Sequence, residues 1–156
     1  INGVCQPPVC CTARTCTTVL NLPAMDGDSM PPDLSKWLDT GIDLLAGCTV
    51  IIAATGTAQY FPGGTTTPDG SGPNPGCTVS PPRSAPDCSH GIGAVIGAIG
   101  TASALLLPGG GPFYVGNVKF LTPSVSGRLY LAYNDIFGGY GNNSGSYQVS
   151  IVGPCK

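Results

Sequence analysis

Glycine and proline interrupt this chain at short intervals. The 156 residues include 24 Gly and 16 Pro, spread along nearly the whole sequence. Both residues are unfavourable inside helices, and proline also removes a backbone donor. All eight acidic residues are Asp, so the strong helix former Glu is missing as well. The sequence therefore predicts an all-β protein built from short strands joined by turns.

The composition supports one folded domain and excludes some classes of function. Apolar residues make up 42% of the chain and the net charge is only -2, which is not the signature of a disordered protein. No helix-length apolar run of about 20 residues occurs, so we expect no membrane span. Nucleic acid is not an expected partner, because the basic residues are scattered singly: Arg14, Lys36, Arg83, Lys119, Arg128 and Lys156.

Eight cysteines indicate an oxidising compartment. The number is even and no CxxC pair occurs, so we expect up to four disulfides in a secreted, extracellular protein rather than a zinc site. The pairing is open, although a Cys77–Cys88 bridge would close a long loop locally. Cys10 and Cys11 are expected to bond to different partners. The first residues carry no signal-peptide pattern, and we expect that any such peptide has been removed.

The chain divides into two parts by composition. Residues 1–36 form a Cys-rich N-terminal extension, and residues 37–156 carry the main pattern of strands and turns. Residues 61–90 form a long loop with seven Pro and five Gly, and loops of this length tend to be functional. The expected strands make a β-sandwich; they are 15–22, 48–54, 94–99, 104–107, 128–133 and 146–152.

The loop 134–146 concentrates oxygen-bearing side chains. It has one carboxylate, two neighbouring amides and two hydroxyls, with four glycines that allow backbone carbonyls to turn inward. Calcium takes six to eight oxygen ligands of these kinds. An Asn- and Gly-rich turn of a hairpin explains the same residues without a metal, and the composition of the loop does not decide between the two.

Residues 133–146, which read YNDIFGGYGNNSGS, resemble the calcium and sugar loop of the PA-IL-like lectins, bacterial calcium-dependent galactose-binding proteins. Weaker similarity upstream extends the resemblance to about residues 37–153. It implies a small jelly-roll-like β-sandwich, similar to galactose-binding domains. The resemblance further implies Ca²⁺ ligands and sugar contacts. The implied metal ligands are Tyr60, Asp135, Gly139, Asn142 and Asn143, and the implied carbohydrate contacts are Asp135, Ile136, Gly139 and Asn142.

One element of the family pattern is missing. The family completes its sugar pocket with a His-Pro-x-Gln stretch, whereas the nearest segment here is Ser84-Ala85-Pro86-Asp87. A galactose-like sugar is thus the expected partner, with its identity open.

Three other interpretations use different residues. His90 and Asp87 could belong to a hydrolase triad, but no GxSxG motif occurs and we expect no enzyme. An acidic group formed by Asp26, Asp28 and Asp33 could bind a second cation or simply be solvated. Finally, the protein could be a structural subunit of an extracellular fibre or surface layer, with self-association through residues 1–36 and a calcium site that only stabilises the fold.

Overall fold

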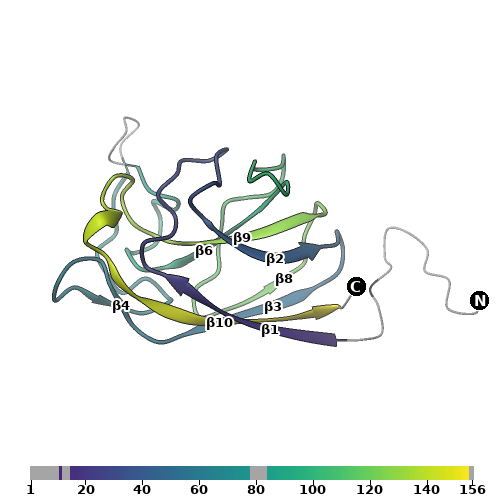
Figure 1. The fold of residues 1–156 in the computed structure, drawn as a ribbon, viewed down its shortest axis with the longest axis horizontal. Coiled ribbons are helices and arrows are strands. Elements are labelled where there is room, and N and C mark those ends of the chain that lie inside the picture. The colour runs from purple at the N-terminus through teal and green to yellow at the C-terminus, as the bar shows by residue number, and fades with distance from the viewer. Residues whose placement is uncertain (1–10, 12–14, 78–83, 155–156) are drawn as a thin grey trace, which may run out of the picture.

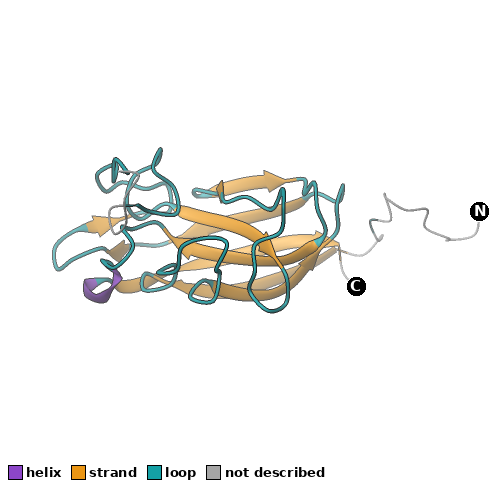
Figure 2. Ribbon diagram, turned by 90° about the horizontal axis from the view of Figure 1, so that it is seen from above, coloured by secondary structure: helices purple, strands orange, loops and turns teal. Residues whose placement is uncertain are grey.

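Two antiparallel sheets form the protein. The computed structural model describes residue 11 and residues 15–77 and 84–154, and no α-helix occurs in that part of the chain. Figures 1 and 2 show the sheets as two layers, with the start of β1 and the end of β10 at one end of the molecule. The larger sheet contains β1 (Thr15–Pro23), β3 (Val50–Thr55), β4 (Ala58–Gln59), β5 (Thr65–Thr66), β8 (Val118–Leu121) and β10 (Ser144–Pro154); the smaller contains β2 (Leu38–Leu44), β6 (Val95–Gly100), β7 (Phe113–Tyr114) and β9 (Gly127–Tyr133).

Strand β10 organises the larger sheet. β1 pairs with it over nine residues, from Thr15 opposite Pro154 to Pro23 opposite Ser146. β3 pairs with it from Gln148 to Val152, and β4 pairs with its first two residues. The smaller sheet has the order β2-β9-β6-β7. The expected β-sandwich is confirmed, and β1 shows that part of the segment 1–36 belongs to its larger sheet.

The main core lies between the two sheets and follows the period of two that strands impose. In β10, Tyr147, Val149 and Ile151 are buried while the residues between them are not. Val50 and Ile52 of β3 are buried in the same cluster. The alternating pattern in this part of the sequence therefore predicts the inward-facing residues correctly.

A second layer of side chains covers the other face of the smaller sheet. All six residues of β6 are buried, and Ile96 packs in this layer with Leu34 and Trp37. The Trp37 indole donates a hydrogen bond to the carbonyl of Ser29 at 3.0 Å. A strand that is covered on both faces has a continuous run of apolar residues in its sequence. This explains why β6 lies within the hydrophobic stretch 92–107. No helix suited to crossing a membrane occurs among the described residues.

The predicted strand 104–107 is wrong. Ala104 has a positive φ of 63° in a tight turn, and Leu105 and Leu106 make only isolated bridges, to Asp33 and Gly100. The turn returns the chain beside the end of β6, but Leu106 donates its N–H to the carbonyl of Pro32 instead of extending a ladder. Apolar character predicted a strand here, whereas the local turn determined the outcome.

Disulfides confirm part of the cysteine prediction. Cys77 is bonded to Cys88 as expected, and Cys11 is bonded to Cys48 and therefore not to its neighbour Cys10. These four cysteines are consequently not zinc ligands. Cys5, Cys10 and Cys155 lie outside the described residues.

A buried chain of hydroxyl groups joins the two sheets. Thr66 Oγ1 lies 2.7 Å from the hydroxyls of both Tyr133 and Tyr147. The Tyr147 hydroxyl donates to the carbonyl of Gly93 at 2.9 Å, so at the shorter contacts Thr66 donates to Tyr147 and accepts from Tyr133. The Thr66 hydroxyl also lies 3.3 Å from the carbonyl of Ala58. Burial raises the pKa of Tyr133 to about 12, so its hydroxyl stays protonated at neutral pH.

Replacing Tyr147 with Phe should destabilise the fold, because the Gly93 carbonyl and the Thr66 hydroxyl would each lose a buried partner. We expect the free energy of unfolding to fall by about 1–3 kcal/mol, measured by urea denaturation. Tyr114→Phe is the matched control, since its hydroxyl bonds to Asp69 at an exposed position where water can substitute. Equal losses in the two variants would contradict the role given to the buried chain.

Candidate cation and sugar site

The candidate site lies at the end of the sandwich opposite the start of β1 and the end of β10 (Figure 1). It is built on the connection between β9 and β10, which contains one 3₁₀ turn, Tyr140–Asn142. This turn is the helical segment in Figure 2. The connection corresponds to the loop 134–146, which the sequence analysis identified as rich in oxygen-bearing side chains. Because the loop leads directly into β10, the strands that pair with the start of β10 lie next to it.

Tyr140 holds the connection in shape. Its hydroxyl donates to the carbonyl of Tyr133 at 2.6 Å and accepts the N–H of Asp135 at 3.1 Å. The side chain is only 2% exposed. Gly27 packs directly on it, because a Cβ at Gly27 would lie 2.8 Å from the Tyr140 hydroxyl. A buried tyrosine thus ties the loop to the end of β9.

Asp135 places a carboxylate inside the protein. Its side chain is 4% exposed, and Oδ1 accepts the N–H of Ile136 at 2.7 Å. Oδ2 is buried without a hydrogen-bond partner in the described structure. Burial raises the pKa of Asp135, while the Ile136 N–H and the Asn143 amide oppose that rise. An ionised carboxylate here has an unmet requirement for positive charge.

Four oxygen-bearing residues meet beside it. The Oδ1 position of Asn142 lies 2.8 Å from the carbonyl oxygen of Gly139, 3.0 Å from that of Tyr60 and 3.3 Å from Asn143 Oδ1. None of these three oxygens can donate a hydrogen bond. Either the Asn142 amide turns its NH₂ group toward them, or a cation lies among the oxygens and balances them.

The Asn143 amide can face only one way. Its Nδ2 donates to the carbonyl of Ala24 at 2.7 Å, which leaves Oδ1 directed at Asn142. The side chain is 6% exposed. A backbone carbonyl in the segment after β1 therefore sets the orientation of a residue in the loop before β10.

Tyr60 reaches the site through strand pairing. β4 ends one residue earlier and pairs with Ser144 and Gly145, the first residues of β10. The Tyr60 N–H donates to the carbonyl of Gly64, which closes the turn between β4 and β5. The structure thus brings together the residues that the resemblance implied as metal ligands, from two segments far apart in the sequence. Ile136 is in the same loop, and its carbonyl accepts the N–H of Gly139 at 2.8 Å.

The site contains few ionisable groups. Across the described ranges, no group of three or more His, Cys, Asp or Glu side chains that could hold a metal is found. The expected acidic group does not act as a unit: Asp33 accepts the N–H of Ser35, whereas Asp28 accepts the N–H of Gly138 at 2.7 Å. Any cation here would be held mainly by amide and carbonyl oxygens.

The segment 84–91 flanks the loop. Asn134, which is fully buried, accepts the N–H of Asp87 at 2.9 Å and donates to the Asp87 carbonyl at 2.8 Å. The N–H of Phe137 donates to the carbonyl of Ser84 at 2.8 Å. The sequence did not predict that Asn134 holds this segment. Its position directly before Asp135 is the one feature of the sequence that could have indicated a role at the site.

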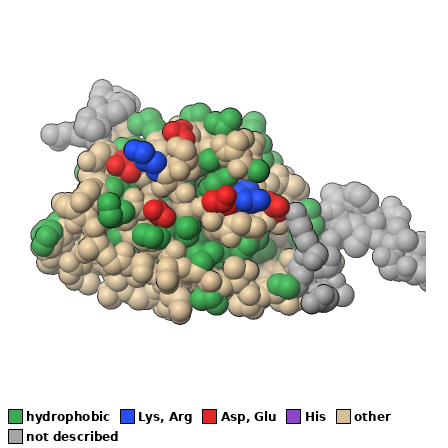
Figure 3. All heavy atoms as spheres, in the orientation of Figure 1, with side chains coloured by type: hydrophobic (Ala, Val, Ile, Leu, Met, Phe, Trp, Pro, Cys, Tyr) green, Lys and Arg blue, Asp and Glu red, His purple; other side chains and the backbone are tan. Residues whose placement is uncertain are grey.

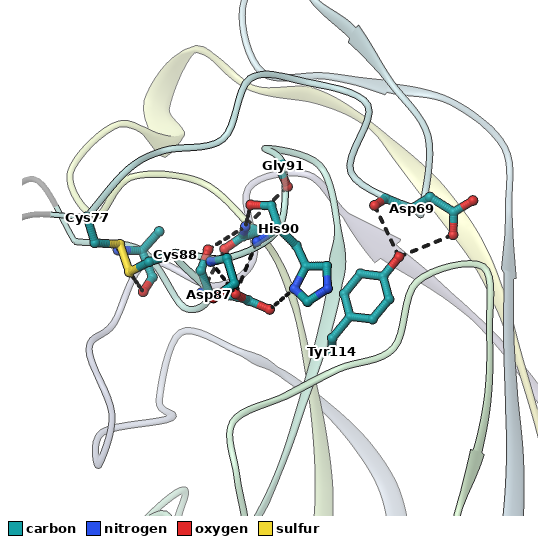
Figure 4. A network of polar contacts seen from close by, with 10 residues as sticks. Asp69, Cys77, Asp87, Cys88, His90, Gly91 and Tyr114 are labelled. Atoms are coloured by element: carbon teal, nitrogen blue, oxygen red, sulfur yellow. Dashed lines mark hydrogen bonds and ion pairs between the residues drawn. A yellow bond between two sulfur atoms is a disulfide. The ribbon is translucent and has the colours of Figure 1, made fainter.

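Figure 4 shows the other contacts of this segment. The Asp87 carboxylate lies 2.6 Å from His90 Nδ1, and the His90 ring stacks on Tyr114 with 3.7 Å between centroids. The Tyr114 hydroxyl in turn lies beside Asp69. These contacts give His90 a role in fixing the segment between Cys77–Cys88 and β6, which explains it without catalysis.

A structural neighbour shares this architecture. The chain matches a solved structure described as the EclA N-terminal domain, a PllA-like lectin, with a TM-score of 0.56 and 21% sequence identity. The match covers 86% of this chain and 94% of that one. At this identity the likeness shows the fold.

A family model gives the relationship itself. Residues 32–154 match the model of the PA-IL-like proteins. The match covers most of the chain and all of the elements around the site except β1 and the segment after it. By this match, the chain belongs to the PA-IL-like protein family.

Proposed function

We propose that this protein is a secreted lectin-like module that binds Ca²⁺ at the loop before β10 and binds carbohydrate through it. Membership of the PA-IL-like family and the likeness to a PllA-like lectin support carbohydrate binding. The observation that carries the calcium proposal is the crowding of the Asn142, Tyr60 and Gly139 oxygens at the loop that also holds Asp135, whose Oδ2 is buried without a hydrogen-bond partner among the described residues.

The distances fit the ion. With oxygens about 2.4 Å from Ca²⁺ and about 72–90° apart in angle, neighbouring ligands lie about 2.8–3.4 Å from each other. The separations from Asn142 Oδ1 are 2.8, 3.0 and 3.3 Å. The donors are all hard oxygens, which suit calcium better than zinc or copper. The proposed ligands are Tyr60, Asp135, Gly139, Asn142 and Asn143.

The protein's own residues prepare the site for a sugar. When bound, Ca²⁺ supplies a positive centre on which neutral hydroxyl oxygens can replace water. Asp135, Ile136, Gly139 and Asn142 border that position and are the proposed sugar contacts. The segment 84–91, held against the loop by Asn134, forms the neighbouring wall. A galactose-like ligand follows from the family resemblance.

Secretion is part of the same proposal. The disulfides Cys11–Cys48 and Cys77–Cys88 join described residues, and such bonds persist in oxidising compartments. Extracellular calcium is also abundant enough for a site with a single direct carboxylate, which would bind it weakly.

A second candidate function, a subunit of an extracellular assembly, is favoured by one surface. On the outer face of the larger sheet, Phe120 is 69% exposed, Val19 58% and Val118 51%. Figure 3 shows a surface with few charged side chains, in small groups. Self-association through this face and the segment 1–36 would cover these residues.

Asp135→Asn should abolish stabilisation by calcium. The variant keeps the shape of the side chain but loses the buried charge, so we expect the calcium affinity to fall at least tenfold, because removing one partner of a buried charge pair costs about 2–5 kcal/mol. In EDTA it should be as stable as the wild type or more stable, since an unbalanced buried carboxylate is gone. Thermal unfolding and isothermal titration with CaCl₂ measure both. Asp69→Asn is the control, and an unchanged calcium response in Asp135→Asn would exclude the site.

Binding of galactosides should require calcium. Titration of methyl galactoside into the calcium-loaded protein is expected to give saturable heat that EDTA removes and added Ca²⁺ restores. Binding that persists in EDTA would contradict a calcium-bridged sugar. If no galactoside binds, a glycan array in calcium buffer tests other sugars, and a negative array would exclude the lectin function.

Phe120→Ser separates the two candidate functions. If the outer face of the larger sheet mediates assembly, the wild type should sediment as oligomers at high concentration and the variant as a monomer. Galactoside and calcium binding should not change, because the site lies at the end of the sandwich. A wild type that remains monomeric in analytical ultracentrifugation would count against the assembly.

A further inference from the structure

Residues 24–28, which follow β1, lie against the candidate site although they precede the family match at residues 32–154. The carbonyl of Ala24 accepts the Asn143 amide at 2.7 Å, and the carbonyl of Asp26 accepts the N–H of Tyr133 at 2.9 Å. The N–H of Ala24 donates to the carbonyl of Gly145 at 3.0 Å. The segment after β1 thus contacts both ends of the loop that connects β9 to β10.

Close packing keeps the segment in place. Gly27 has a φ of 134°, and a Cβ there would lie 2.9 Å from the carbonyl oxygen of Tyr133 as well as against the Tyr140 hydroxyl. Its N–H donates to the carbonyl of Lys36 at 2.8 Å. A side chain at this position would push the segment away from the loop, so its approach depends on glycine.

Asp28 brings a second carboxylate to this place. Its Oδ1 accepts the N–H of Gly138 at 2.7 Å, in the same loop as the proposed ligands. Gly138 directly precedes Gly139, one of the proposed carbonyl ligands. The negative charge of Asp28 therefore lies against a loop whose proposed ligands, apart from Asp135, are neutral oxygens.

We propose that Asp28 is a positioning residue of the calcium site, which holds the Gly138 backbone and raises calcium affinity through its charge without being a ligand. The inference rests on the proposed calcium binding. It makes residues 24–28 part of the site, and it gives a role to one member of the acidic group formed by Asp26, Asp28 and Asp33. Calcium affinity in proteins rises with the number of nearby carboxylates.

The test compares Asp28→Asn and Asp28→Ala in the full chain with Asp33→Asn as the matched control. The amide of Asp28→Asn can still accept the Gly138 N–H but carries no charge. We expect calcium dissociation constants about three- to thirtyfold higher than in the wild type at low salt, with a smaller difference at 0.5 M NaCl, where charge effects are screened. Asp28→Ala should bind more weakly still, and Asp33→Asn should bind as the wild type does.

Stability in EDTA provides a second readout. Asp28→Asn should unfold at the wild-type temperature or above it, because the hydrogen bond remains and repulsion from Asp135 is removed. A calcium affinity equal to that of the wild type would overturn the proposal for Asp28, and so would an affinity loss that is independent of salt and accompanied by lower stability in EDTA. A wild type that binds no calcium would instead overturn the proposed function and this inference with it.

Discussion

The pairing of β10 on both of its edges is the constraint on which the rest of the structure depends. β1 occupies one edge for nine residues and β3 the other, so β10 cannot shift register without displacing both. Its first residues also pair with β4. Asn142 and Asn143 directly precede the strand, and Tyr60 directly follows β4. The geometry of the candidate site is therefore set by the ladder of the larger sheet rather than by the loop itself.

Neutral oxygens surround a single buried charge in this site. Desolvation opposes ionisation of Asp135, and only the Ile136 N–H and the Asn143 amide compensate within the loop. The proposed cation would provide the missing compensation, with the Asn142 amide oxygen and the Tyr60 and Gly139 carbonyl oxygens around it. A protein with 9% charged residues can build such a site because backbone carbonyls and amides carry most of it.

The sequence predicts the loop well because its chemical groups are contiguous, and it predicts the strands whose apolar residues alternate or are β-branched. It fails where backbone atoms decide. Asn143 donates its hydrogen bond to the backbone carbonyl of Ala24, and any residue type can supply such a carbonyl. The sequence therefore predicted that the segment after β1 belongs to an N-terminal extension. Leu105 and Leu106 are apolar like strand residues, but the turn at Ala104 takes them out of the ladder. Tyr60 was predicted as a ligand only through the family resemblance. Its proposed ligand atom is the backbone carbonyl oxygen, which every residue type carries.

The bond between Ala24 and Asn143 joins residues that are 119 positions apart. During synthesis from the N-terminus, Ala24 is made 119 residues before its partner. The segment after β1 therefore cannot form this bond until the chain has been made through Asn143. Contacts of such long range form slowly. Completion of the loop is thus a late event in folding, and a chain truncated before residue 143 lacks the groups that would report it.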